Sequence, residues 1–359
     1  MKRFVSAAAA LTTMVLASAC GTTPDGGSTA ADASLTDCKG QSIKQTQTAV
    51  TLLYLPANMA IEANYFDELG LKVEIVELGA STESLQAVAA GSADIAVVSL
   101  SQTLAARTAG APVRAISMVT TPMAVQIVIK KSIANELNLS ETSSPEERAR
   151  AFKGRTIGIS SPGASTDRVA RFLMDSVGLN PDKDAKIVPL GGSSEAVAAF
   201  VRGSVDILVY SSPVTEKAAL EGEGVSLVNV AAGDIPALDN FDSAVAVANA
   251  NEVKKNPSKY VCYAMGLQKA MSDIKDDYQV AADAVYPSFK GVDKSLYDLG
   301  LKNTAPAYVG SIEISDDQVA KAVGFVKQFG GKVSEEAEAE VVATDVIDRA
   351  IEALKNGEK

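Results

Sequence analysis

The chain of 359 residues contains no histidine and no tryptophan, and the missing histidines exclude several kinds of site. A Ser–His–Asp triad, a Cys–His pair and an imidazole-based zinc site all need that side chain. The Walker A, GxGxxG and GxSxG spacings are missing as well. The sequence therefore predicts a protein that binds rather than catalyses, with no metal ion and no cofactor.

Long apolar runs are also missing after the first twenty residues, so no transmembrane helix is expected. At the start of the chain, Lys2 and Arg3 precede a short apolar stretch that ends in Ala17-Ser18-Ala19-Cys20. This pattern is typical of a lipoprotein signal peptide over residues 1–19, with lipid (palmitate) on Cys20. The alternative is an ordinary secretory signal with a chance cysteine.

Residues 20–47 are rich in Gly, Thr and Asp and are expected to form a flexible tether. The lipid would hold the protein on the extracytoplasmic face of a bacterial cell membrane, with the body of the chain outside the bilayer. This arrangement would let the body reach a partner in the same membrane.

Basic residues are too few for a nucleic-acid partner. Removal of residues 1–19 leaves 31 basic and 44 acidic residues, a net charge of −13, and no basic face is visible.

Cysteine is scarce too. With lipid on Cys20, the remaining Cys38 and Cys262 form either a disulfide or two unpaired thiols.

The most informative feature that is present is a repeat at a fixed offset of 112 residues. Residues 76–83 (VELGASTE) return as residues 188–195 (VPLGGSSE), and residues 91–99 (GSADIAVVS) return as residues 203–211 (GSVDILVYS). Two copies of one strand–helix–strand unit predict two similar α/β lobes that face each other across a cleft.

Apolar runs that alternate with helical patterns predict a mostly parallel sheet flanked by helices in each lobe. Lobe 1 is expected to comprise residues 48–131 plus 239–359, and lobe 2 residues 132–238. Strands are predicted over residues 48–55, 71–78, 95–98, 113–120, 125–131, 156–159, 225–230 and 244–248.

Short loops rich in Ser, Thr and Gly follow the strands of both lobes and lead into helices. Unpaired N–H groups at such helix starts carry partial positive charge, and ligands of open α/β sheets bind at the carboxyl ends of the strands. Each loop taken singly is better explained by helix capping than by ligand binding. Because the two lobes would point their loops at one another, we expect the loops together to form a ligand site.

Several motifs in register resemble a known family. They are YFDELGLKVE at residues 65–74, GSADI at 91–95, KGRTIG at 153–158 and GSVDI at 203–207. In this order they resemble the solute-binding proteins of nitrate, sulfonate, taurine and thiamine-precursor uptake systems. The resemblance implies a two-lobed periplasmic-binding-protein fold (type II-like), and a monomer that delivers a small molecule to the membrane permease of an ABC importer.

The resemblance also implies which residues bind ligand. The family's ligand-contacting loops map onto Asn58, Ser81, Thr82, Ser99, Ser101, Gln102, Ser165, Thr166, Tyr210 and Ser212. Neutral loops rich in hydrogen-bond donors favour a small polar anion such as a sulfonate, nitrate or an organic carboxylate. A thiamine-precursor pyrimidine, or another neutral or heteroaromatic nutrient, is the alternative ligand. An enzyme working through a carboxylate or a lysine in the cleft, and a surface interaction protein without a small ligand, are the competing functions.

Overall fold

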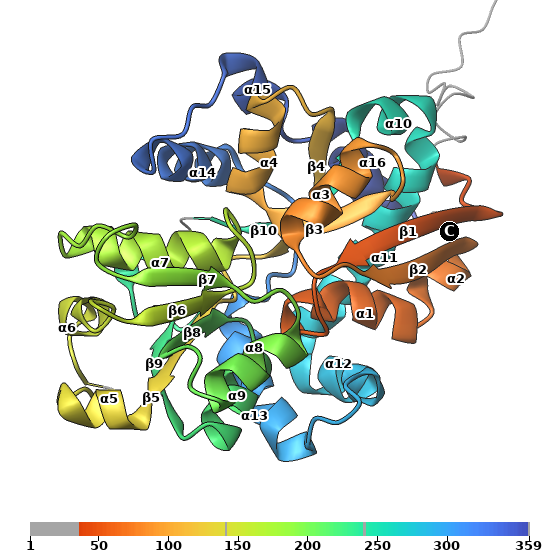
Figure 1. Ribbon diagram of the computed structural model, residues 1–359. Helices are drawn as coiled ribbons and strands as arrows, with labels where there is room; N and C mark the ends of the chain where they lie inside the picture. Colours follow the sequence, from red (N-terminus) through yellow and green to blue (C-terminus); the bar gives the residue numbers. More distant parts are fainter. Residues whose placement is uncertain (1–35, 141, 240–241, 358–359) are drawn as a thin grey trace, which may run out of the picture.

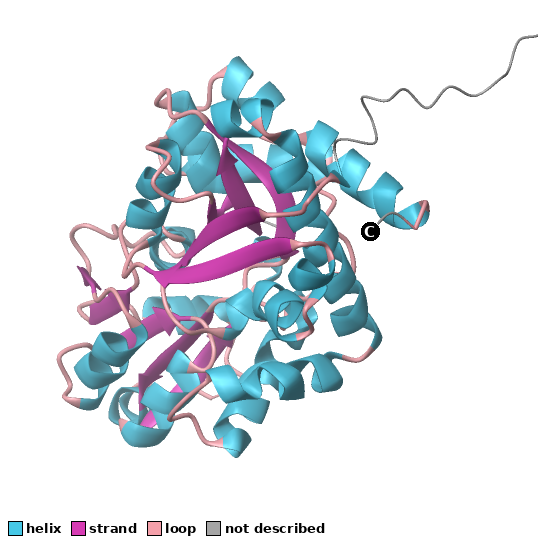
Figure 2. Ribbon diagram, turned by 90° about the vertical axis from the view of Figure 1, so that its right-hand side faces the viewer, coloured by secondary structure: helices cyan, strands magenta, loops and turns pink. Residues whose placement is uncertain are grey.

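The computed structural model describes residues 36–140, 142–239 and 242–357, in which two five-stranded mixed sheets are flanked by helices (Figure 1). Figure 2 shows the two sheets one above the other, each with helices around it. The first sheet has the order β2-β1-β3-β10-β4 and the second β7-β6-β8-β5-β9. The strands are β1 (Gln41–Gln47), β2 (Leu71–Glu77), β3 (Ile95–Ser99), β4 (Val113–Thr120), β5 (Gln126–Lys130), β6 (Thr156–Ile159), β7 (Lys186–Pro189), β8 (Ile207–Tyr210), β9 (Gly224–Asn229) and β10 (Ala244–Asn249).

The two sheets share one topology, which accounts for the sequence repeat. In the first, β1 pairs in parallel with β2 and β3, and in the second β6 pairs in parallel with β7 and β8. The repeated helices α3 (Ser81–Ala89) and α8 (Ser193–Val201) begin and end at the 112-residue offset. Asp94 and Asp206 also correspond, and each accepts a backbone N–H at 2.8 Å, from Lys44 and Thr156 respectively.

Each sheet contains an antiparallel strand that enters from the other half of the chain. After β4 the chain crosses to the second sheet as β5, which pairs antiparallel with β8 and β9. After β9 it crosses back as β10, which pairs antiparallel with β3 and β4. We call the first sheet with its helices lobe one and the second sheet with its helices lobe two. These two crossings join the lobes and confirm the predicted two-lobed α/β fold.

Two predicted boundaries are wrong. The strand expected at residues 48–55 lies earlier, as β1, so the expected tether of residues 20–47 includes seven residues of the first sheet. Residues 48–55 instead lead through the 3-10 turn Leu52–Tyr54 into helix α1 (Leu55–Glu62). Strand β5, expected in lobe 1 because residues 48–131 were assigned there, lies in the second sheet. The predicted signal peptide of residues 1–19, the predicted lipidation site Cys20 and the first part of the predicted tether, up to residue 35, lie outside the described residues.

Strand β1 was missed because, apart from Ile43, its buried residues are polar. Gln45 is fully buried, and its side-chain oxygen Oε1 accepts a hydrogen bond from the Tyr263 hydroxyl at 2.6 Å. Thr46 donates its hydroxyl hydrogen to the Ile95 carbonyl at 3.2 Å. Burial of polar groups is tolerated where such partners exist, but the partners are distant in sequence, and hydrophobic patterning does not reveal them.

The helices cover both sheets. They are α1, α2 (Tyr65–Glu68), α3, α4 (Leu100–Thr108), α5 (Lys131–Glu136), α6 (Pro145–Arg150), α7 (Ser165–Ser176), α8, α9 (Val214–Glu221), α10 (Ala250–Lys255), α11 (Pro257–Asp276), α12 (Tyr278–Val285), α13 (Lys294–Thr304), α14 (Asp316–Gln328), α15 (Glu335–Glu340) and α16 (Thr344–Lys355). Across the described ranges, no helix has both the length and the apolar character needed to cross a bilayer.

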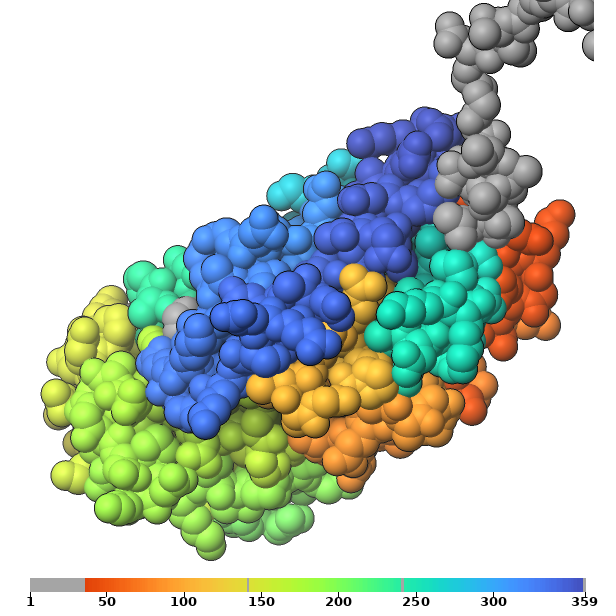
Figure 3. All heavy atoms as spheres, turned by 90° about the horizontal axis from the view of Figure 1, so that it is seen from above, coloured from red at the N-terminus to blue at the C-terminus, as the bar shows by residue number. Residues whose placement is uncertain are grey.

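The C-terminal helices belong mainly to lobe one and also contact lobe two. Helix α11 is largely buried beside sheet one, where Gly266 leaves room for the ring of Phe66. Helix α14 packs on α4 but contributes Phe325 to the core of lobe two. Figure 3 shows the C-terminal segment in blue, running across lobe one to the edge of lobe two.

A disulfide ties the first described segment to the body. Cys38, just before β1, is bonded to Cys262 in the middle of α11, with 5.8 Å between their Cα atoms. Both residues are buried in the core of lobe one. Of the two alternatives that the sequence left open, the structure has the disulfide.

Candidate functional site

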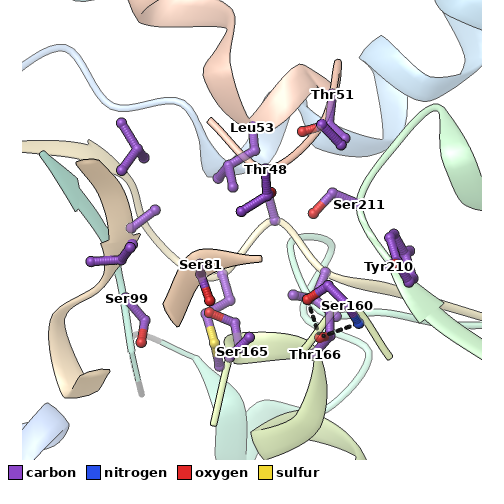
Figure 4. Close-up of a pocket in the computed structure, with 18 of the residues that line it drawn as sticks. Thr48, Thr51, Leu53, Ser81, Ser99, Ser160, Ser165, Thr166, Tyr210 and Ser211 are labelled. Atoms are coloured by element: carbon purple, nitrogen blue, oxygen red, sulfur yellow. Dashed lines mark hydrogen bonds between the residues drawn. The ribbon is translucent and has the colours of Figure 1, made fainter. Parts of the chain in front are cut away.

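A cavity of about 70 Å³ lies between the two lobes at the carboxyl ends of strands β3 and β8 (Figure 4). Both lobes contribute to its wall, and so does the segment between β4 and β5 that crosses from one lobe to the other. The lining residues are Thr48, Ala49, Thr51, Leu53, Tyr54, Ser81, Val97, Val98, Ser99, Gln102, Met123, Ala124, Val125, Ser160, Ala164, Ser165, Thr166, Tyr210, Ser211 and Ala244. None of these side chains carries a charge, so hydroxyl, amide and backbone groups supply the polar part of the wall.

The lobes touch each other around this cavity. The hydroxyls of Ser81 and Ser161 lie 3.2 Å apart, and the Leu52 N–H donates to the Ser212 carbonyl at 2.9 Å. Gly79 and Gly191, which are equivalent in the repeat, also meet, since a Cβ on Gly191 would lie 3.7 Å from the Gly79 carbonyl oxygen. The repeated loops therefore face each other across the cavity, in a closed arrangement of the lobes.

The predicted ligand-binding residues divide into two groups. Six of them line the cavity, namely Ser81, Ser99, Gln102, Ser165, Thr166 and Tyr210. Four do not, namely Asn58, Thr82, Ser101 and Ser212. Asn58 is buried in α1, and Thr82 lies on α3 beside Ser81.

Ser101 and Ser212 are held by buried carboxylates instead. Ser101 donates its hydroxyl hydrogen to Asp242, and Ser212 donates its own to Glu216 at 2.7 Å. Ser212 also accepts from the Gln126 side-chain amide at 2.6 Å. Both serines therefore lie outside the cavity wall, with their hydroxyl hydrogens bonded to carboxylates.

Several residues that line the cavity are not among the predicted ligand-binding residues. Thr48, Thr51 and Leu53 were assigned to a strand, which would have directed their side chains elsewhere. Ser160 and Ser211 lie in the same predicted loops as Ser165 and Ser212 and line the cavity as well. The spacing of Ser and Thr in a loop indicates a polar wall, but it does not say which hydroxyl faces inward.

Two helices begin at the cavity without a side-chain cap. The N-cap residues of α3 and α7 are Ala80 and Ala164, and neither has a side-chain oxygen that could accept from the first turn. Ser81 from lobe one and Ser165 and Thr166 from lobe two follow these caps and line the cavity. Uncapped helix starts leave N–H groups and the positive end of the helix dipole available to an anion.

A third helix, α4, begins at the cavity with its N-terminus already occupied. Ser99 caps it by accepting from the Gln102 N–H at 3.1 Å, and the Asp242 carboxylate accepts from the Ser101 N–H at 3.0 Å. Burial raises the pKa of Asp242, while bonds from Ser101 and Ser243 and the charge of Arg168 oppose this rise. Asp242 therefore occupies at α4 the position that is open at α3 and α7.

The fold and the cleft define the class of protein: two α/β lobes, joined by two crossing segments, that enclose a small uncharged cavity. Comparison with known proteins then identifies the family. The sequence profile of the NMT1/THI5-like family matches residues 53–279, more than half of the chain. The chain belongs to this family, and the predicted relationship to the uptake-system binding proteins is confirmed.

The individual relatives share less than a quarter of their residues with this chain. A protein of Bacillus subtilis (strain 168), named as a candidate aliphatic sulfonates-binding protein, is 23% identical over 286 residues, which are 79% of each chain. A solved structure from Bordetella bronchiseptica RB50 has a TM-score of 0.74 at 22% identity, covering 88% of this chain and 98% of that one. The alkanesulfonate-binding protein SsuA from Xanthomonas axonopodis pv. citri, bound to MOPS, has a TM-score of 0.64 at 18% identity, covering 87% and 98%.

Proposed function

We propose that this protein is the lipid-anchored, extracytoplasmic binding component of an ATP-driven importer. It captures a small organic anion, a sulfonate or a carboxylate, between its lobes and presents the closed form, as a monomer, to a membrane permease. The observation that carries the proposal is the pair of uncapped helix starts, α3 and α7, which reach the cavity from opposite lobes. The family and the sulfonate-related names of its relatives support the same function.

The charges near the cavity are compatible with an anion. The N–H groups that bond back to the N-cap carbonyls of α3 and α7 are those of Ser84 and Arg168, at 3.1 and 3.0 Å, so the N–H groups of Ser81 and Ser165 come before the helical bonding begins. Asp167 lies in the first turn of α7, but its carboxylate accepts from Arg171 at 2.7 Å and from the Gly163 N–H at 2.8 Å. Each helix terminus stabilises an anion by about 0.3–1 kcal/mol when exposed and more when partly buried. Two such termini, together with hydroxyl donors, offset the unfavourable long-range field of an acidic protein.

Closure of the lobes provides selectivity for size. The lobes already meet around the cavity through Ser81 and Ser161, so a ligand that binds here contacts both lobes and favours the closed form. A small head group fits the cavity of about 70 Å³, whereas a bulky ring system would hold the lobes apart.

Titration calorimetry tests the proposed ligand class. We expect ethanesulfonate or a short carboxylate to bind with a Kd in the micromolar range or tighter, because one anion contacts two helix termini and several hydroxyls. Pyrimidines and cationic amines of similar size serve as the comparison. Binding of those compounds alone, with no anion bound, would contradict the proposal.

Lipid anchoring is tested separately by the substitution Cys20→Ala. The variant should leave the membrane fraction for the soluble extracytoplasmic fraction, because a signal peptide without the lipidated cysteine supplies no acyl anchor. Its affinity for the ligand should be unchanged, since the described body does not include Cys20. A variant that stays with the membrane would show that another element holds the protein there.

A further inference from the structure

Helix α14 is attached to lobe one at both of its ends. Before the helix, the Met118 N–H of β4 donates to the Ile312 carbonyl at 2.8 Å. After the helix, the Ser334 N–H donates to the Thr108 hydroxyl of α4 at 3.2 Å. Three residues of the helix are buried in the core of lobe one, namely Ala322, Val323 and Val326. Because of these contacts, α14 has to move with lobe one.

The same helix places an aromatic side chain in lobe two. Phe325 is fully buried, and it belongs to the hydrophobic core of lobe two rather than that of lobe one. Phe329, one turn later, packs against the same core, and the two rings meet edge to face with 5.1 Å between their centroids. Figure 1 shows α14 beside α4 and above α7. The helix therefore packs against both lobes, with neighbouring faces in two different cores.

Arg168 of α7 is the charged group of lobe two at this contact. Its guanidinium lies over the Phe325 ring, 5.6 Å from the centroid, and its Nε donates to the Gly163 carbonyl at 2.9 Å. A cation over an aromatic face is attracted to it. Burial raises the pKa of Asp242, which is bonded to α4 of lobe one, and the positive charge of Arg168 opposes this rise. Arg168 therefore favours the closed lobes through both a ring and a carboxylate of lobe one.

These contacts bear on how the cavity opens. The lobes meet around the cavity, so a ligand can enter only when they separate about the crossing segments. Since α14 is fixed to lobe one, separation draws Phe325 out of the core of lobe two. Transfer of a large aromatic side chain from a core to water is unfavourable. This resistance to opening is present whether or not a ligand is bound.

We propose that α14 is a latch between the lobes: Phe325, carried by lobe one and seated in lobe two, holds the ligand-free protein closed, and the cavity opens only when Phe325 leaves its seat. The proposal goes beyond ligand capture, because it does not depend on the chemistry of the ligand. A site whose closed form already predominates loses little affinity to a low population of the binding-competent state. The latch therefore trades rapid entry of ligand for retention.

Distances between spin labels in the ligand-free protein test the latch. The labels are attached through Gln86→Cys on α3 of lobe one and Asp175→Cys on α7 of lobe two, two exposed positions. The Cys20→Ala background is used, in which Cys38 and Cys262 remain bonded to each other. The protein is unfolded in urea, dialysed and refolded without reductant, so that no ligand is carried over from the cell.

Pulsed electron paramagnetic resonance should show one short distance in this labelled parent. Phe325→Ala should add a longer distance and raise the ratio of open to closed molecules about tenfold or more, because most of the apolar surface that seats the latch is removed. A parent that is already open without ligand would overturn the proposal, and so would the same distance distribution in the parent and in Phe325→Ala.

Val323→Ala is the matched control, since Val323 lies on the same helix but is buried in lobe one. It should lower the urea concentration of unfolding and leave the lobes closed. Opening of Val323→Ala to the same extent as Phe325→Ala would overturn the proposal, because loosening of the whole molecule would then explain both. If Phe325→Ala does not fold, Phe325→Leu replaces it. Leucine keeps an apolar group in the seat and removes the ring below Arg168, so the ratio should still rise severalfold, and an unchanged ratio would contradict the latch.

Discussion

Replacement of Ala164 by aspartate should abolish anion binding and leave the protein folded. Ala164 is the N-cap of α7, with an extended backbone (φ −71°, ψ 167°), and it lines the cavity. An aspartate in this conformation accepts from the second or third N–H of the helix, as N-cap carboxylates do. Its negative charge would occupy the place proposed for the ligand's anionic group, so we expect affinity to fall by about 100-fold or more.

Ala164→Asn is the matched control for charge. Asparagine caps helices as well as aspartate does and has nearly the same shape, but it is neutral. It should weaken anion binding less than Ala164→Asp, and both variants should unfold within about 1–2 kcal/mol of wild type, because a cap is gained. Calorimetric titration with ethanesulfonate and urea unfolding measure the two effects. Wild-type affinity in Ala164→Asp would mean that the start of α7 does not hold the anion.

Apart from the core substitutions on α14, removal of the Cys38–Cys262 disulfide should lower the free energy of unfolding most among the substitutions proposed for this protein. The bond closes a loop with a sequence separation of 224 residues and joins the segment before β1 to the buried helix α11. Cross-links over long loops restrict the unfolded chain, and losing one costs about 2–4 kcal/mol. The doubly substituted Cys38→Ala, Cys262→Ala variant should therefore unfold at clearly lower urea concentration.

A reduced sample of the parent protein is the control for this variant. In the Cys20→Ala background, which leaves these two cysteines alone, reduction should lower stability to the level of the double variant and leave the double variant unchanged. We also expect weaker ligand binding, because β1 leads directly into Thr48 and Thr51 of the cavity wall. Equal unfolding free energies for the oxidised parent and the double variant would contradict a stabilising disulfide.

The sequence predicted two of the strands and the pair of repeated helices best. Strands β4 and β6 coincide with the predicted residues, and α3 and α8 keep the offset that the repeat implies. In these segments local propensity, hydrophobic pattern and tertiary position agree. The crossing at β5 was assigned to the wrong lobe, because a buried strand has the same pattern in either sheet.

Errors arose where polar residues are buried. The apolar residues Val50, Leu52 and Leu53 suggested a strand, whereas the strand is the polar β1, whose Gln45 depends on Tyr263 more than two hundred residues later. Likewise, Ser101 and Ser212 looked like ligand donors because their carboxylate partners, Asp242 and Glu216, were not predicted to lie beside them. Which group a serine donates to depends on the neighbours that the fold brings beside it, and these neighbours are distant in sequence.

A crystal structure of the protein with ethanesulfonate tests the central claim most directly. The account predicts sulfonate oxygens within hydrogen-bond distance of backbone N–H groups in the first turns of both α3 and α7, with the two lobes closed over the ligand. A sulfonate bound by one lobe alone, or at the outer surface away from Ser81 and Ser165, would contradict it.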